Sequence, residues 1–259
     1  GSVTLPVDLQ DHIRYPQDLF AIQAEKYIKY HMQNPEYFYG NEDLWAFPNE
    51  KFGQGDELQI VEPYYAIMKL PGETEEEFVQ LIPYTPNDRP NLVGWLAARS
   101  DKENYGNLVG VNFPKDTQID GPEQVEARID NDQEISAWFT LRCSEGSSCI
   151  RGNLFVVPIG TSLLYAEPIY IQAEGVSFPE LKKVILASAD KVVMGDSLDD
   201  AIFMLTGSKS SLSDEVSSQK STSAESSSEK IGPIDEILKS VESLQKQFEA
   251  LQQLIQSLK

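Results

Sequence analysis

Residues 149–173 read CIRGNLFVVPIGTSLLYAEPIYIQA and form the longest apolar stretch of the chain. β-Branched and aromatic residues dominate this stretch, which favours strands over a helix. Pro158, Gly160, Glu167 and Pro168 interrupt it, whereas a membrane-spanning helix needs about 20 consecutive apolar residues. We therefore expect two buried strands joined at 158–160, with the rest of the chain packed around them.

The flanking segments predict an α+β body over residues 3–206, in which N-terminal helices pack on a mainly antiparallel β core. Apolar periodicity predicts helical structure within 11–48, and PEQVEARIDND (122–132) predicts a short helix. Turn-forming pairs separate successive strands, which favours hairpins over helical crossovers. The other expected strands are 58–70, 77–84, 92–98, 105–113, 181–188 and 192–194.

A last helix is predicted over residues 198–206, LDDAIFMLT. Ser197 is a favourable N-cap, and Gly207 is a favourable residue to end the helix. Asp199 and Asp200 would lie in the first turn, where the helix dipole favours acidic side chains. A structural role therefore explains this pair of aspartates.

The chain after the body predicts two further segments. Residues 207–232 are mostly serine with few apolar residues, which predicts a disordered linker. Residues 233–259 predict a coiled-coil helix, because every a and d position is apolar through four heptads. Its polar face carries more acids than bases, unlike a membrane-surface helix. The expected oligomerisation residues are Ile234, Ile237, Val241, Leu244, Phe248, Leu251, Ile255 and Leu258.

The coiled-coil pattern predicts self-association or docking on a partner helix. The e and g positions hold mainly Gln and Ser. Because charged residues at these positions usually set partner choice and orientation, the pattern leaves the number and direction of the helices open.

Cys143 and Cys149 flank the loop SEGSS. A strand-like run, ISAWFTLRC, ends at Cys143 and another begins at Cys149, so a hairpin would place their Cα atoms about 5–6 Å apart. We predict a disulfide, which would indicate an oxidising compartment. The alternative is a pair of free thiols, and a zinc site lacks two further ligands at the usual spacing.

The formal net charge is −20, of which residues 1–206 contribute −18. This charge repels nucleic-acid phosphates and anionic lipids, so we expect no nucleic-acid partner. It permits divalent cations or basic partners, and it is also typical of a soluble surface. The acidic run Glu73, Glu75, Glu76 and Glu77 is expected to be solvated.

The candidate metal ligands are Asp130, Asp132 and Glu134, which resemble half of a calcium loop without its glycine and closing glutamate. The two histidines, His12 and His31, are expected to have structural roles. The sequence contains no GxSxG, no HExxH and no phosphate-binding glycine loop, so no cofactor and no catalytic residue is predicted.

Several blocks, in order, are similar to one known family. They cover about residues 12–206 and are HIRYPQDLF, FYGNEDLW, EPYYAIMKLPGETEEEFVQLIPYTPNDRPNLVGWLAARSD, YGNLVGVNFPK, GPEQVEARID, ISAWFTL, RGNLFVVPIGTSLLYAEPIYIQA and PELKKVILA. Together they resemble the C-terminal soluble part of uncharacterised protein family 0182, a set of large bacterial integral membrane proteins found in cyanobacteria and other phyla. The linker and the coiled-coil segment lie outside this resemblance.

The resemblance implies a soluble fragment of a cell-membrane protein, attached to the membrane by N-terminal segments that this chain lacks. The fragment would lie outside the cytoplasm, in a periplasmic or lumenal space, which also supports the disulfide. Gly1 and Ser2 resemble the remnant of an expression tag. The family supplies no established activity and no catalytic residues.

We therefore expect a non-catalytic extracytoplasmic domain that acts in assembly or partner binding through its C-terminal helix. One alternative is a divalent-cation-binding outer domain of a transport-related membrane protein, which the acidic body supports. Another is a carboxylate-based hydrolase. Two carboxyl groups with opposite pKa shifts in one cleft would favour the hydrolase.

Overall fold

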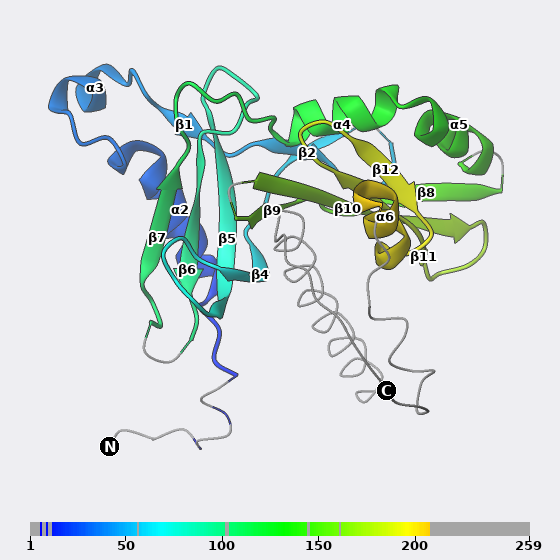
Figure 1. Cartoon of the computed structure of the whole chain (residues 1–259), viewed down its shortest axis with the longest axis horizontal. Helices are drawn as coiled ribbons and strands as arrows, with labels where there is room; N and C mark the ends of the chain where they lie inside the picture. Colours follow the sequence, from blue (N-terminus) through cyan, green and yellow to red (C-terminus); the bar gives the residue numbers. More distant parts are fainter. Residues whose placement is uncertain are drawn as a thin grey trace, which may run out of the picture.

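The computed structural model describes residues 6, 9, 12–55, 57–101, 104–143, 146–160 and 162–207. These residues form two antiparallel sheets of five strands each, a two-stranded sheet and several helices. In Figure 1 the strands of the first large sheet run vertically, and those of the second run across the page. The α+β class and the antiparallel core are confirmed. The predicted linker, from residue 208 on, and the coiled coil lie outside the described residues.

The first sheet is organised around β5 (Glu76–Pro86). Strands β4 (Tyr64–Lys69) and β1 (Trp45–Ala46) pair with different halves of β5. Strand β6 (Gly94–Arg99) also pairs with β5, and β7 (Leu108–Asn112) follows β6. All six residues of β6 are buried, including the charged Arg99 at its end, and the apolar run before Arg99 is typical of a strand that is buried on both faces.

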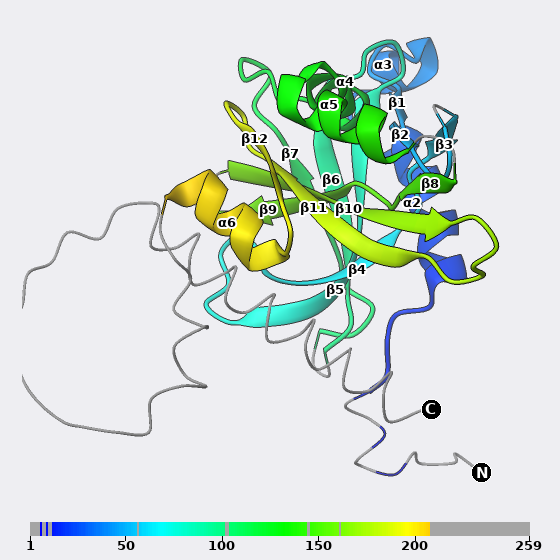
Figure 2. The ribbon, with the colours of Figure 1, turned by 90° about the vertical axis from the view of Figure 1, so that its right-hand side faces the viewer.

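Helix α2 (Gln17–Tyr30) covers one face of this sheet (Figure 2). Phe20 and Ala24 on its inner side are fully buried. The buried Tyr84 hydroxyl donates a hydrogen bond of 2.9 Å to the Ala24 carbonyl. At the end of the helix, the His31 ring stacks on Trp45 with centroids 3.7 Å apart.

The helical region is shorter than the predicted 11–48. Helix α3 (Pro35–Gly40) follows α2, and Asn41 then adopts a left-handed conformation with φ 54°. A left-handed residue ends a helix, so the chain leaves the helical region there and enters β1. The predicted helical region is therefore wrong beyond Gly40.

The second sheet is organised around β10 (Ser162–Ala173), the second half of the opening stretch. Strands β9 (Phe155–Ile159) and β8 (Ser147–Arg151) pair with different halves of β10. On the other edge lie β11 (Glu180–Ala187) and β12 (Val192–Gly195). The predicted hairpins β9–β10 and β11–β12 are confirmed, and the opening stretch contributes part of a third strand.

Helices cover both faces of the second sheet. On β11, Ile185 and Ala187 pack with the core residues of α4 (Pro122–Asn131) and α5 (Gln133–Arg142). The alternate residues of β11 pack against α6 (Leu198–Thr206). The capping predictions for α6 are confirmed: the Ser197 hydroxyl accepts from the Asp200 amide at 3.1 Å, and Gly207 has φ 73°.

Two strand predictions are wrong in detail. The predicted strand 58–70 is two strands, β3 (Leu58–Ile60) and β4, separated at Pro63, and β3 pairs with β2 (Asn49–Lys51) instead of the large sheet. The run before Cys143 is helix α5, not a strand. Its Ile, Trp, Phe and Thr residues raise strand propensity, but tertiary packing overrides propensity.

The structure joins Cys143 and Cys149 in a disulfide with Cα atoms 5.2 Å apart. The predicted hairpin around them is wrong, because the bridge ties the end of helix α5 to strand β8. The closed loop therefore holds the helix end against the sheet.

The expectation that the acidic run 73–77 is solvated is wrong for Glu77, whose exposed fraction is only 8%. The Arg99 guanidinium donates from Nε to Glu77 at 2.6 Å, and its Nη1 lies 2.8 Å from Glu73. Asn104 adds a hydrogen bond of 2.9 Å to Glu77. These contacts fasten the turn between β4 and β5 to the end of β6.

We predict that Gly94→Ala destabilises the fold. A Cβ atom at this position would lie 2.2 Å from the Val111 carbonyl oxygen, so β6 and β7 would have to separate. Such overpacking costs about 1–3 kcal/mol, measurable by denaturant unfolding. Gly40→Ala is the matched control, because its Cβ would meet only the flexible Glu42 side chain. Equal stability of the two variants would contradict this packing.

Candidate functional site

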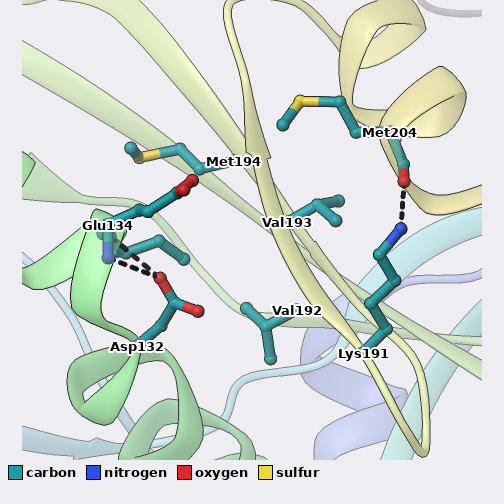
Figure 3. A pocket seen from close by; sticks show the side chains of 8 residues that line it. Asp132, Glu134, Lys191, Val192, Val193, Met194 and Met204 are labelled. Carbon is teal, nitrogen blue, oxygen red and sulfur yellow. Dashed lines mark hydrogen bonds between the residues drawn. The ribbon is translucent and has the colours of Figure 1, made fainter.

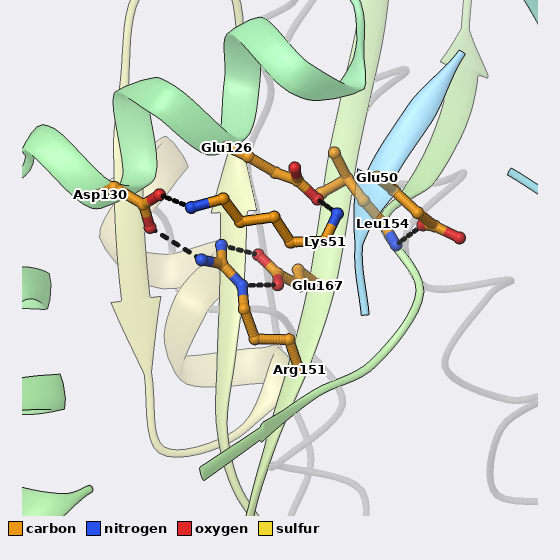
Figure 4. Close-up of polar contacts among 7 residues, drawn as sticks. All are labelled: Glu50, Lys51, Glu126, Asp130, Arg151, Leu154 and Glu167. Carbon is orange, nitrogen blue, oxygen red and sulfur yellow. Dashed lines mark hydrogen bonds and ion pairs between the residues drawn. The ribbon is translucent and has the colours of Figure 1, made fainter. Parts of the chain in front are cut away.

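A group of buried charged residues lies where β2, α4 and the second sheet meet (Figure 4). It contains four carboxylates and two cationic side chains, and we call it the buried charge cluster. Its members are Glu50, Lys51, Glu126, Asp130, Arg151 and Glu167.

Arg151 connects the cluster. Its Nε and Nη2 donate to the two oxygens of Glu167 at 2.5 and 3.0 Å, and its Nη1 donates to Asp130 at 2.7 Å. Glu167 has no solvent exposure. A buried charge is strongly unfavourable unless it is paired and hydrogen-bonded, so this geometry is what permits both charges in the interior.

Lys51 gives Asp130 its second partner, with Nζ 2.6 Å from Oδ2. Burial alone would raise the pKa of Asp130, but its hydrogen bonds to Lys51 and Arg151 outweigh burial and lower that pKa below its usual range. Asp130 is therefore ionised and bridges both cations of the cluster.

Glu50 occupies the side of the cluster nearest β9. Its carboxylate accepts hydrogen bonds from the Leu154 amide at 2.6 Å, from Asn153 at 2.8 Å and from Gln59 at 3.1 Å. The residue is fully buried, and this burial raises its pKa, although the three hydrogen bonds oppose the shift.

Glu126 differs from the other members because only one of its oxygens has a partner. Oε1 accepts from the Lys51 amide at 2.6 Å, whereas Oε2 has no hydrogen-bond partner among the described residues. The residue is 1% exposed. Burial raises its pKa to about 8, helped by the nearby charges of Glu167 and Glu50. Glu126 is therefore mainly protonated at neutral pH.

Local sequence explains how these side chains meet. Glu126 and Asp130 are four residues apart on α4, so they share one face of the helix. Arg151 ends β8, where its backbone exchanges hydrogen bonds of 2.9 Å with Gly53 and brings the chain after β2 beside it. Sequence reasoning missed the cluster, and its one signal was Glu167, an acid within the apolar opening stretch.

The three candidate metal ligands do not converge. Asp130 belongs to the cluster, while Asp132 caps α5 by accepting from the Glu134 and Ile135 amides at 3.0 Å. The Glu134 side chain lines a separate cleft. Within the part of the chain that the structure describes, no group of three or more His, Cys, Asp or Glu residues is placed to hold a metal ion.

That cleft, of about 320 Å³, lies between α5, β12 and α6 (Figure 3). Its rim is polar, and its walls are mainly Val and Met side chains. The Lys191 ammonium on its rim donates to the Met204 carbonyl. The lining residues are Asp132, Glu134, Ile135, Lys191, Val192, Val193, Met194 and Met204.

A second cleft, of about 270 Å³, lies beside the ends of β1 and β5. Asn49 and Glu123 line it and are joined by a hydrogen bond of 2.8 Å. Both clefts are lined by residues other than Glu126 and Asp130. The two carboxyl groups with opposite pKa shifts therefore lie outside either cleft, with Glu126 buried and the Asp130 side chain 35% exposed.

The fold and its buried charge cluster define an α+β domain whose hydrophobic interior contains one group of charged residues. Residues 2–142 match the model of the Uncharacterised protein family (UPF0182). The chain belongs to this family, which confirms the resemblance. Among the described residues, no helix is long and apolar enough to cross a membrane.

Relatives from several bacteria are similar to this chain. A UPF0182 protein of Pelotomaculum thermopropionicum is 50% identical over 204 residues, which are 79% of this chain and 22% of the relative. One from Nostoc is 50% identical over 198 residues, 76% of this chain and 20% of the relative. The chain thus spans about a fifth of the length of these curated relatives. No solved structure matches the chain.

One relative changes the expectation about the tail. A UPF0182 protein of Trichodesmium erythraeum is 42% identical over 264 residues, which cover 98% of this chain and 28% of the relative. This match reaches well beyond residue 206. In this relative the similarity therefore extends into the linker and the coiled-coil segment, whereas the matches to the other two relatives cover 79% and 76% of the chain.

Arg151→Met should destabilise the body by about 3–5 kcal/mol, because Glu167 would keep a buried charge without its partner. Denaturant unfolding measures the change. Arg89→Met is the matched control, since Arg89 pairs with Asp88 on the exposed surface at 3.8 Å. We expect Arg151→Met with Glu167→Leu to recover part of the loss. A loss no larger than that of the control would contradict the role of Arg151.

We predict that Glu126→Gln changes how stability depends on pH. The pKa of Glu126 is raised from 4.5 to about 8 in the folded chain, so its contribution is fully present below pH 4.5 and is lost as pH rises towards 8. Glutamine keeps the neutral form at every pH. The unfolding free energy of the variant relative to wild type should therefore rise between these limits, by at most about 1.4 kcal/mol per pH unit.

Denaturant unfolding at acidic, neutral and alkaline pH measures this difference. The matched control is Glu134→Gln, whose side chain is exposed at the start of the next helix. A constant difference between Glu126→Gln and wild type across this range would show that Glu126 does not hold a proton in the folded chain.

Proposed function

We propose that the chain is a non-catalytic extracytoplasmic module of an integral membrane protein that acts in assembly or partner binding. The buried charge cluster carries this proposal. Its ionised groups are hydrogen-bonded to one another inside the protein and join β2, α4, β8 and β10. Charged groups used in this way hold a scaffold together, whereas a catalytic carboxylate needs contact with a substrate.

The extracytoplasmic placement is supported by the disulfide between Cys143 and Cys149. Disulfides persist in oxidising compartments and are rare in the cytosol of most bacteria. The short coverage of the relatives supports the rest of the proposal, since most of each relative lies outside the region matched here. The membrane segments would belong to that remainder.

The assembly role is assigned to residues 234–258, which lie outside the described residues. The four heptads with apolar a and d positions are typical of helices that bind other helices. The preceding serine-rich segment would allow the helix to reach a partner without changing the body. The proposed occupants are the same helix of a second copy or a helix of another protein.

Leu244→Asp with Leu251→Asp should reduce the solution mass, because two charges would then lie in the apolar seam. The matched control is Ser243→Asp with Ala250→Asp, which adds the same charge at c positions outside the seam. Light scattering on a sizing column measures the mass of each full chain. If the seam variant keeps the wild-type mass of an oligomer, residues 234–258 do not set the size of that oligomer.

A carboxylate-based hydrolase is the second candidate, and one observation favours it. Glu126 and Asp130 share one helix face and have pKa shifts in opposite directions, as acid and base pairs often do. The Asp130 side chain is partly exposed, but a substrate would reach Glu126 only if β2 moved away from α4. Labelling of the folded chain with a carboxylate-directed reagent distinguishes the two: modification of Glu126 supports the hydrolase, and protection supports the scaffold.

A further inference from the structure

Strand β7 forms the outer edge of the first sheet. It pairs with β6 on one side, and within the described part of the chain no strand pairs with its other side. Figure 1 shows β7 at the side of the sheet farthest from the second sheet. Its free edge therefore faces away from the rest of the body.

The backbone groups that point to this free edge follow from the hydrogen-bond pattern of the β6–β7 pair. The Phe113 amide donates to Val93 at 2.8 Å, and the Arg99 amide donates to Asn107 at 2.9 Å. In an antiparallel pair the bonded positions alternate, so Val109 and Val111 bond to β6. The N–H and C=O groups of the other strand residues, Leu108, Gly110 and Asn112, point outward.

The sequence of β7 does nothing to block pairing. Natural sheet edges usually carry a lysine, a proline, an inward charge or a bulge that prevents another strand from adding. Residues 107–113 read NLVGVNF, without a charge or a proline. The register with β6 is continuous, whereas the β10–β11 pair has a register shift.

Several other outer strands of the two large sheets contact neighbouring elements. The edge of β8 exchanges hydrogen bonds of 2.9 Å between Arg151 and Gly53. Helix α6 packs on β12. Strand β4 lies beside β9, and the Tyr64 hydroxyl donates to the Val156 carbonyl at 2.6 Å. In β7, the three residues whose backbone groups point outward, Leu108, Gly110 and Asn112, are all exposed.

We propose that the free edge of β7 is an interface that pairs antiparallel with β7 of a second copy of this chain. The strand is its own complement, since a twofold axis through Gly110 places Leu108 opposite Asn112 of the second copy. All outward N–H and C=O groups of these three positions then bond across the axis, and the two first sheets become one continuous sheet.

The side chains of β7 fit this arrangement. Val109 and Val111 are half-buried against the Trp95 side of the sheet, and each would lie opposite the other valine of the second copy. Cross-strand pairs of β-branched residues are favourable. Gly110 has no side chain on the other face, where a Cβ would lie 2.4 Å from the Tyr27 hydroxyl oxygen.

The negative charge of the body also favours β7 as the contact between two copies. Two bodies of −18 repel each other, and repulsion between exposed charges is screened over about 8 Å at physiological ionic strength. A strand without charged residues lets two acidic bodies meet at low electrostatic cost. Pairing should therefore strengthen as salt concentration rises, which is the opposite of an interface made by ion pairs.

The test is cross-linking of the full chain with Leu108→Cys and Asn112→Cys together. Directly opposed residues in an antiparallel pair lie about 5.5 Å apart between Cα atoms, within the range of a disulfide. Under mild oxidation we expect the double variant to give a covalent dimer as its major species. Each single variant should stay monomeric on a non-reducing gel, since its cysteine would face the wild-type residue of the second copy.

Repeating the cross-linking with Leu244→Asp and Leu251→Asp added separates this interface from the tail. A dimer that persists there, and increases with salt, belongs to β7 alone. A double variant without a dimer, or single variants that cross-link as well as the double variant, would overturn the proposal. Neither result depends on whether residues 234–258 assemble.

Blocking the edge is an independent measurement. Leu108→Lys with Asn112→Lys places like charges across the proposed axis, so the dimer that light scattering detects for the seam variant should be lost. The matched control is Tyr37→Lys with Tyr39→Lys on α3, which adds the same charge at exposed positions. Dimer loss in both variants would attribute the effect to charge in general and would also overturn the proposal.

Discussion

The body depends on one buried ion pair, the fork of hydrogen bonds between Arg151 and Glu167. Both side chains are directional, so the pair forms only when β8 and β10 hold one register and α4 presents Asp130 from above. A hydrophobic contact would tolerate a shift of either element. A shift that separated the ion pair would leave a buried charge without its partner, which is strongly unfavourable. The pair therefore specifies how the layers of the second half of the chain fit together.

The cluster also changes how the net charge of the body should be understood. Counting every acid as ionised gives four negative and two positive charges in the interior. Glu126 holds a proton near neutral pH because burial and its acidic neighbours raise its pKa. The interior is then closer to neutrality than the sequence suggests, and the strongly acidic character of the protein belongs mainly to its surface.

Sequence patterns predicted the elements better than the site. The buried strand β6, the hairpin β9–β10 and both caps of α6 follow from local residue types, which act over a few positions. Helix α5 was missed because its residues favour strands, although Ile135, Trp138 and Phe139 follow the i, i+3, i+4 spacing of one helix face. The cluster was not predicted, since its partners are far apart in sequence and only the fold brings them together.

The partners in the buried charge cluster are far apart in sequence, and this separation affects how the chain folds during synthesis. Glu50 receives its backbone hydrogen bond from a residue 104 positions later, and Lys51 binds Glu126 75 positions later. Non-local contacts of this kind slow folding. The buried charge cluster cannot be complete until β10, which carries Glu167, has been synthesised. The family model ends at residue 142, inside this set of contacts. The similarity to individual relatives extends further, over 204 residues in one of them, and so spans both sides of these contacts.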